Sequence, residues 1–137
     1  SPEGYKVQKT PVEMMKAIGV ASAMGDSSRN LWLKIPFCED YARVVRATTL
    51  PLLMLGGESK GDPTGTIREF VKGMKAGANV RGALVGRNIL FPGKDDPLAT
   101  ALAVNRVVHA GVSTEEAVDF LMKNRDIHMD ALTRHIR

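Results

Sequence analysis

The chain has 137 residues, of which 44% are hydrophobic and 25% are charged, and its formal net charge is +4. These values are typical of one globular domain and exclude a fibrous or wholly disordered protein. The lysines and arginines are scattered among acidic residues, and only 5% of residues are aromatic. We therefore expect no nucleic-acid partner, because neither a basic block nor a stacking surface is present.

Cys38 is the single cysteine, which excludes an internal disulfide and a cysteine-rich metal site and indicates a reducing, cytoplasmic setting. The histidines lie far along the chain from the apolar segments, so we expect no metal. No apolar run approaches the roughly 20 residues of a membrane-spanning helix. The first residues also lack the pattern of a secretory leader, and we expect no membrane association.

Capping residues mark the predicted helices in chain order. Thr10 and Pro11 begin the first, Asp62 and Pro63 and then Asp96 and Pro97 begin later ones, and Ser113 begins the last. The helical segments are predicted at residues 11–24, 39–48, 63–76, 88–91 and 97–110 and from residue 114, with a tail at 126–137 that either continues as helix or docks loosely.

Three apolar runs between these helices are predicted to be strands, at residues 31–37, 51–56 and 82–86. The first is almost continuously apolar, as in a parallel sheet with both faces covered. Strands that alternate with helices indicate βαβ units and an α/β fold. A complete TIM (β/α)₈ barrel takes about 250 residues, so the sequence predicts one partial TIM-barrel domain over residues 1–137.

Lys34 is a lone amine within the apolar run of residues 31–37. Removing a lysine from water favours its neutral, nucleophilic form, which forms Schiff bases with carbonyl substrates. We therefore expect a buried Lys34 with a covalent, aldolase-type role that needs no cofactor. The alternative is a structural lysine that forms a salt bridge or extends to solvent, and strand alternation leaves the direction of the side chain open.

Glycines end the second and third predicted strands, and an arginine follows the third. Ligands of parallel α/β folds gather at the carboxyl ends of strands, where glycine lets backbone N–H groups approach an anion. We expect Gly56, Gly57, Gly86 and Arg87 to bind a substrate phosphate. Phosphate sites of TIM barrels follow strands seven and eight, which would make these three strands the sixth, seventh and eighth.

The polar loop after the second strand adds Ser59 and Lys60 as further candidate pocket residues. Each of these features also has a plainer explanation. The loop can be simply solvated, the glycine pair can be a tight turn, and Arg87 can pair with a surface carboxylate.

Three motifs resemble the C-terminal part of the class I aldolase group that includes deoxyribose-phosphate aldolase and the archaeal-type fructose-bisphosphate aldolases. They are Leu-Trp-Leu-Lys-Ile-Pro at residues 31–36, Leu-Met-Leu-Gly-Gly at 53–57, and the segment 77–89, which ends Val-Gly-Arg-Asn-Ile. The resemblance implies that Lys34 is the Schiff-base lysine of the sixth strand. It also implies that the glycines and Arg87 hold the substrate phosphate.

The sequence departs from the group in two respects. Glu58 and Ser59 follow the glycine pair where the fructose-bisphosphate aldolases have Pro-Lys, which is closer to a less characterised, actinobacterial-like branch. The group's acidic residue on the first strand and its proton-transfer residues on the fourth and fifth strands have no counterpart here. The general acid and base are therefore expected outside this chain.

These observations predict a class I aldolase that acts on a phosphorylated sugar or a small aldehyde or ketone. The chain would be its C-terminal fragment, inactive alone, lacking the N-terminal half of the barrel and belonging to a homo-oligomer. The alternative is a non-catalytic phosphate-binding or assembly module that completes its barrel with another chain. A doubly wound nucleotide-binding domain is disfavoured, because no G-x-G-x-x-G follows the first strand.

Overall fold

A computed structural model describes residue 4, residues 8–125 and residue 127. The helical spacing expected for residues 128–137 lies outside these described residues, as does most of the N-terminal loop. Among the described residues, no helix has the length and apolar character needed to cross a membrane.

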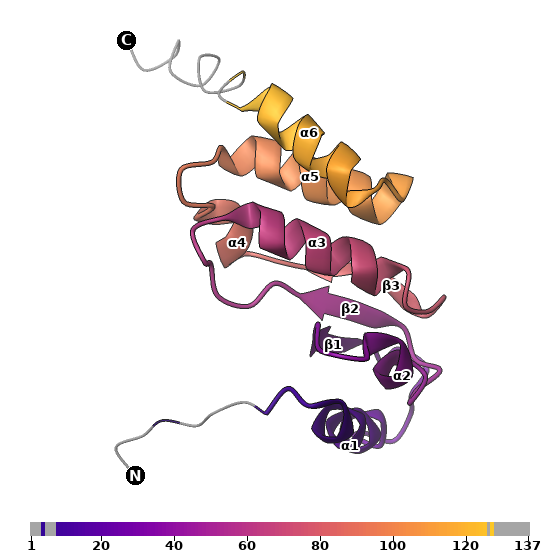
Figure 1. Cartoon of the computed structure of the whole chain (residues 1–137). Helices are drawn as coiled ribbons and strands as arrows, with labels where there is room; N and C mark the ends of the chain where they lie inside the picture. The colour runs from indigo at the N-terminus through magenta and orange to yellow at the C-terminus, as the bar shows by residue number, and fades with distance from the viewer. Residues whose placement is uncertain (1–3, 5–7, 126, 128–137) are drawn as a thin grey trace.

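The described chain contains six helices and three strands, which alternate as far as β3 and are followed by three helices in succession (Figure 1). They are α1 (Pro11–Ser22), β1 (Leu33–Pro36), α2 (Tyr41–Val45), β2 (Leu52–Leu55), α3 (Pro63–Met74), β3 (Val80–Leu84), α4 (Arg87–Leu90), α5 (Pro97–Ala110) and α6 (Thr114–Asn124). In Figure 1, α1 and α2 lie beside β1, while α5 and α6 form the opposite end of the molecule.

The strands form one parallel sheet in the order β1-β2-β3. Lys34 of β1 pairs with Leu53 of β2, and Leu55 of β2 pairs with Leu84 of β3. The predicted α/β class with three parallel strands is thereby confirmed. All three strands point the same way, so the loops that follow them gather at one end of the sheet.

Helices bury one face of this sheet, and the other face is open in the described chain. Leu33 and Ile35 are buried, and Leu52 and Met54 are completely buried. The alternate side chains are much more accessible, with Trp32 55% and Leu84 53% exposed. The expectation that both faces are covered is therefore wrong for these residues. A continuous apolar run indicates that both faces of a strand are apolar, but it does not say whether this chain supplies the segment that covers each face.

The covered face is closely packed against α3. Ile67 and Phe70 of this helix are fully buried, and each such side chain contributes roughly 1.5–3 kcal/mol on burial. Gly73 lies on the same helix, and a Cβ there would fall on the sulfur of Met54. The missing side chain of Gly73 thus lets α3 approach the centre of the sheet.

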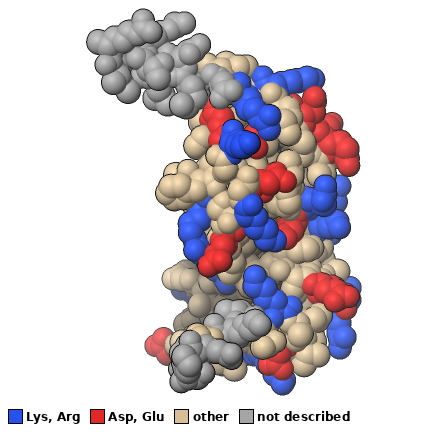
Figure 2. All heavy atoms as spheres, turned by 60° about the vertical axis from the view of Figure 1, so that its left-hand side comes forward, with Lys and Arg blue, Asp and Glu red and all other residues tan. Residues whose placement is uncertain are grey.

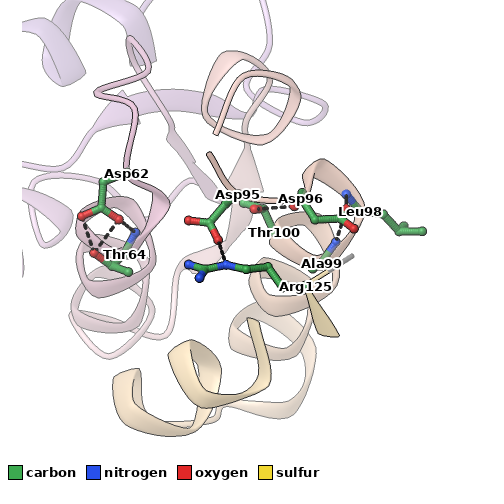
Figure 3. Close-up of polar contacts among 8 residues, drawn as sticks. All are labelled: Asp62, Thr64, Asp95, Asp96, Leu98, Ala99, Thr100 and Arg125. Carbon is green, nitrogen blue, oxygen red and sulfur yellow. Dashed lines mark hydrogen bonds and ion pairs between the residues drawn. The ribbon is translucent and has the colours of Figure 1, made fainter. Parts of the chain in front are cut away.

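The capping residues behave as predicted at four helices, including Thr10 at α1, and two of these caps appear in Figure 3. Asp62 accepts a hydrogen bond from the Thr64 N–H at 2.9 Å, and Asp96 accepts one from the Leu98 N–H at 2.7 Å. At α6, Ser113 and Glu116 form the complete reciprocal capping box. The bounds of α5 also agree with the prediction, because Gly111 ends it in the left-handed region with φ 64°.

All three strands differ in their bounds from the prediction, and one helix is much shorter than predicted. The apolar runs at 31–37 and 51–56 extend beyond the paired residues, so β1 and β2 are shorter than predicted. β3 begins at Val80 rather than at residue 82, since Arg81 interrupts its apolar pattern while lying on the open face. The predicted helix at 39–48 is reduced to α2, a single turn of five residues.

The cap of α3 gives a pH-dependent prediction. Hydrogen bonds from the side chain and then the backbone of Thr64 lower the pKa of Asp62. The contribution of this carboxylate to stability is present above the ordinary aspartate pKa and is lost as the pH falls through the lowered, folded value. Asp62→Ala should reduce the free energy of unfolding by about 1 kcal/mol at neutral pH and flatten its acid dependence.

Urea denaturation at a series of pH values checks this prediction. Asp62→Asn is the matched control, because it keeps an oxygen acceptor that does not titrate. An acid dependence in Asp62→Asn as steep as in the wild type would contradict the assignment.

Candidate active site

A hollow of about 280 Å³ lies at the carboxyl ends of the three strands. Its lining consists of Lys34, Leu55, Gly56, Gly57, Leu84, Gly86 and Arg87. All five residues predicted for the Schiff base and for phosphate binding line this one hollow, although they come from three strands. Its volume is near the lower end of the roughly 300–1,000 Å³ of small-molecule pockets.

Lys34 reaches the hollow from the open face of the sheet. Its neighbours Leu33 and Ile35 point into the core, so the alternation of the strand directs the Lys34 side chain the other way. The side chain is exposed, which corrects the expectation that it is buried. The physical reason is that no described residue covers this face.

Gly56 and Gly57 form the wall that follows β2. A Cβ on Gly56 would meet the side chain of Val85, so only glycine fits at this position without movement. Gly57 has φ +68°, in the left-handed region that glycine adopts most readily. The turn therefore depends on two glycines for two different reasons, steric closeness at the first and backbone conformation at the second.

Arg87 and Glu58 face each other beside the hollow. One guanidinium nitrogen of Arg87 lies 3.6 Å from Glu58 Oε1, and the two side chains are 62% and 84% exposed. Such an exposed pair contributes about 0–1 kcal/mol and is screened by salt. Figure 2 shows that acidic and basic side chains are interspersed on the face of the molecule that it displays.

Ser59 and Lys60, the two further candidate pocket residues, are not among the residues that line the hollow. The Ser59 hydroxyl donates to the carbonyl oxygen of Phe91 and accepts from the Gly61 N–H at 3.2 Å. Its hydrogen bonds therefore join two loops of the protein. Lys60 is exposed to solvent.

Asn88 is the residue of this region whose role the sequence analysis missed. It is only 3% exposed, and its amide nitrogen donates to the carbonyl oxygens of Gly56 and Gly57. The sequence contained it as one letter of the Gly-Arg-Asn-Ile motif. The local periodicity of the sequence cannot predict a hydrogen bond between residues that lie more than thirty positions apart.

The chemistry available in the hollow is that of an amine and a guanidinium beside glycine backbone. An amine can add to a carbonyl carbon, and a guanidinium with nearby N–H groups can hold an anion. No group of three or more metal-binding side chains occurs among the residues that the structure describes.

The two steric environments of the glycines predict different responses to alanine. Gly56→Ala should lower the free energy of unfolding by roughly 1–3 kcal/mol, the range of overpacking in a closed site. Gly86→Ala should leave it nearly unchanged, because a Cβ at Gly86 meets nothing within 4 Å and its φ is −128°. Urea denaturation of the two variants checks this, and equal losses would contradict the described wall.

The Glu58–Arg87 pair predicts that Glu58 competes with any anion for the guanidinium. Glu58→Gln should therefore tighten the binding of inorganic phosphate by a few-fold at low ionic strength, given the roughly 0.2–1 kcal/mol of an exposed pair. The gain should disappear at high salt. Isothermal titration calorimetry at two salt concentrations measures it, with Glu69→Gln on α3 as the control. Weaker phosphate binding by Glu58→Gln would contradict this role.

Comparison with known proteins shows the following similarities. A family model described as Cgl0159-like matches residues 3–108. The 2-amino-3,7-dideoxy-D-threo-hept-6-ulosonate synthase 1 of Archaeoglobus fulgidus is 28% identical over 88 residues, which are 64% of this chain and 32% of that protein. The crystal structure of Cgl0159 from Corynebacterium glutamicum matches with a TM-score of 0.70 and 30% identity, over 77% of this chain and 35% of that one.

Both matched proteins are much longer than this chain, which spans about one third of the length of each. The structural match shows that the three parallel strands and their helices correspond to part of a larger α/β protein. Since the family model covers most of the sequence, including the whole candidate site, the chain belongs to the Cgl0159-like family.

Proposed function

We propose that this chain carries the Schiff-base lysine and the phosphate-binding loops of a class I aldolase that acts on a phosphorylated sugar. The observation that carries the proposal is that Lys34, the two glycine strand ends and Arg87 line one hollow. The similarity to a synthase of a dideoxy-heptulosonate, a carbon chain that bears a keto group by its name, agrees with carbonyl chemistry.

Lys34 is the nucleophile of this mechanism. Its neutral amine adds to the substrate carbonyl carbon, the carbonyl oxygen takes up protons, and water leaves to give an iminium ion. The iminium then accepts the electron pair of the carbon–carbon bond that breaks, which produces an enamine and an aldehyde. Water finally hydrolyses the iminium that forms when the enamine is protonated, and it frees Lys34. We assign the proton transfers to residues outside this chain.

Arg87 and the glycine turns are the proposed anchor of the substrate phosphate. A guanidinium matches two phosphate oxygens in a bidentate geometry, and glycine backbone permits close approach of N–H groups. Holding the phosphate would fix the distance of the carbonyl from Lys34, which is the main benefit of substrate positioning.

The same proposal assigns the three strands to a TIM barrel, as its sixth, seventh and eighth strands. The open face with Trp32 and Leu84, and the outer edges of β1 and β3, call for further strands. The matched proteins are about three times as long as this chain, which is long enough for the remaining strands of a barrel. In this arrangement Lys34 points into the barrel.

The open face also favours a second candidate, a non-catalytic module that binds phosphate and completes its barrel with another chain. Both candidates use the same hollow and the same sheet edges. They differ in Lys34, which is a nucleophile only in the first.

The test is covalent trapping of the amine. Dihydroxyacetone phosphate and sodium cyanoborohydride should leave a reduced adduct on Lys34, identified by peptide mass spectrometry, and dihydroxyacetone should react much less because it lacks the phosphate. Lys34→Arg should abolish the adduct, since a guanidinium keeps the charge but is not a nucleophile.

Lys72→Arg on the exposed side of α3 is the matched control and should retain the adduct. Trapping is done on this chain and on the longer protein that the proposal implies. Normal turnover of the longer protein with Lys34→Arg would eliminate the aldolase proposal and leave the phosphate-binding module.

A further inference from the structure

The side-chain amide of Asn88 joins the two loops that form the wall of the hollow. Asn88 lies in α4, after β3, and the carbonyls that it contacts belong to Gly56 and Gly57, after β2. The contact to the Gly57 oxygen is 3.5 Å, and the contact to the Gly56 oxygen is shorter. An amide that is 3% exposed is here shared between two successive peptide groups.

A peptide group is planar and trans, so its C=O and its N–H point in opposite directions. Drawing the Gly56 carbonyl toward Asn88 therefore fixes the direction of the Gly57 N–H. Drawing the Gly57 carbonyl toward the same amide fixes the Glu58 N–H in the same way. One side chain thus contacts the carbonyls of two successive peptide groups whose N–H groups lie at the end of β2.

We propose that Asn88 is a positioning residue that sets these two peptide planes and thereby shapes the anion-binding part of the hollow. The inference rests on the proposed function, in which this turn holds the substrate phosphate. Asn88 does not line the hollow itself, so its effect passes through the glycine turn.

The other contacts between the loops do not replace Asn88. Ser59 reaches the Phe91 carbonyl, and a Cβ on Gly93 would fall on the Gly61 carbonyl, so the loops also meet farther from the strand ends. These contacts hold the loops together, but none of them involves the carbonyl of Gly56 or of Gly57. Gly57 makes rotation easy, because glycine has the widest choice of backbone angles.

A second asparagine provides a matched control within the same chain. The Asn79 amide donates to the carbonyls of Val45 at 2.9 Å and Thr48 at 3.0 Å, immediately before β3. It therefore makes the same kind of contact, from side-chain amide to loop carbonyls, at the opposite end of the sheet. Losing its amide costs similar hydrogen bonds without touching the hollow.

The experiment compares Asn88→Ala, Asn88→Asp and Asn79→Ala in the ¹⁵N-labelled full chain. Residual dipolar couplings of the Gly57 and Glu58 N–H groups report the peptide planes, and amide shifts during titration with inorganic phosphate report affinity. We expect both Asn88 variants to change these couplings and to weaken phosphate binding about tenfold, the effect of losing one to two buried hydrogen bonds. Asn79→Ala should lower the urea midpoint and leave the couplings and the phosphate affinity unchanged.

Each result decides a definite point. Unchanged couplings and affinity in a folded Asn88 variant would overturn the inference and leave the proposed phosphate site intact. Absence of phosphate binding in the wild type would refute the phosphate part of the proposed function, while the couplings still decide whether Asn88 sets the peptide planes. Aspartate has nearly the shape of asparagine, so Asn88→Asp is used for the test if Asn88→Ala does not fold.

Discussion

The parallel register of β1, β2 and β3 is the constraint on which the candidate site depends. Leu52 and Met54 anchor the middle strand by complete burial against the helices, and this fixes which side chains of the neighbouring strands face the other way. Lys34 is consequently presented on the face opposite to the core. The same register brings the ends of all three strands to one level, so loops distant in sequence share one hollow. A slip of one residue in β1 would exchange the faces and turn Lys34 toward the helices.

Two asparagines, one at each end of the sheet, donate hydrogen bonds to loop carbonyl groups, and the two loops have different roles. Asn79 gathers the carbonyls of the connection between α2 and β2 before β3 begins, where no predicted site residue lies. Asn88 gathers the carbonyls of the glycine turn after β2 has ended. Buried amides of this kind satisfy carbonyl groups that the strand ladder leaves over. The hydrogen bonds of Asn79 hold the connection before β3, and in the proposed role those of Asn88 also orient backbone donors.

Local signals in the sequence were sufficient wherever the physical cause is local. Ser113 with Glu116 predicted the start of α6, because a capping box involves only residues of one turn. Strand ends were less accurate, since pairing with a neighbour rather than apolar character decides where β1 and β3 stop. The exposure of Lys34 was missed because its burial depends on whether another segment packs against that face of the sheet. Asn88 was missed because its acceptors lie in the turn after another strand, although its place beside Gly86 and Arg87 in the motif was a signal.

The open face of the sheet connects the packing of this chain to its proposed chemistry. Trp32 and Leu84 expose apolar surface beside Lys34, and strands with free outer edges border it. A segment that covers this face would bury the apolar side chains and at the same time exclude water from the amine. In the proposed barrel, closing the sheet therefore both completes the core and encloses Lys34 beside its substrate.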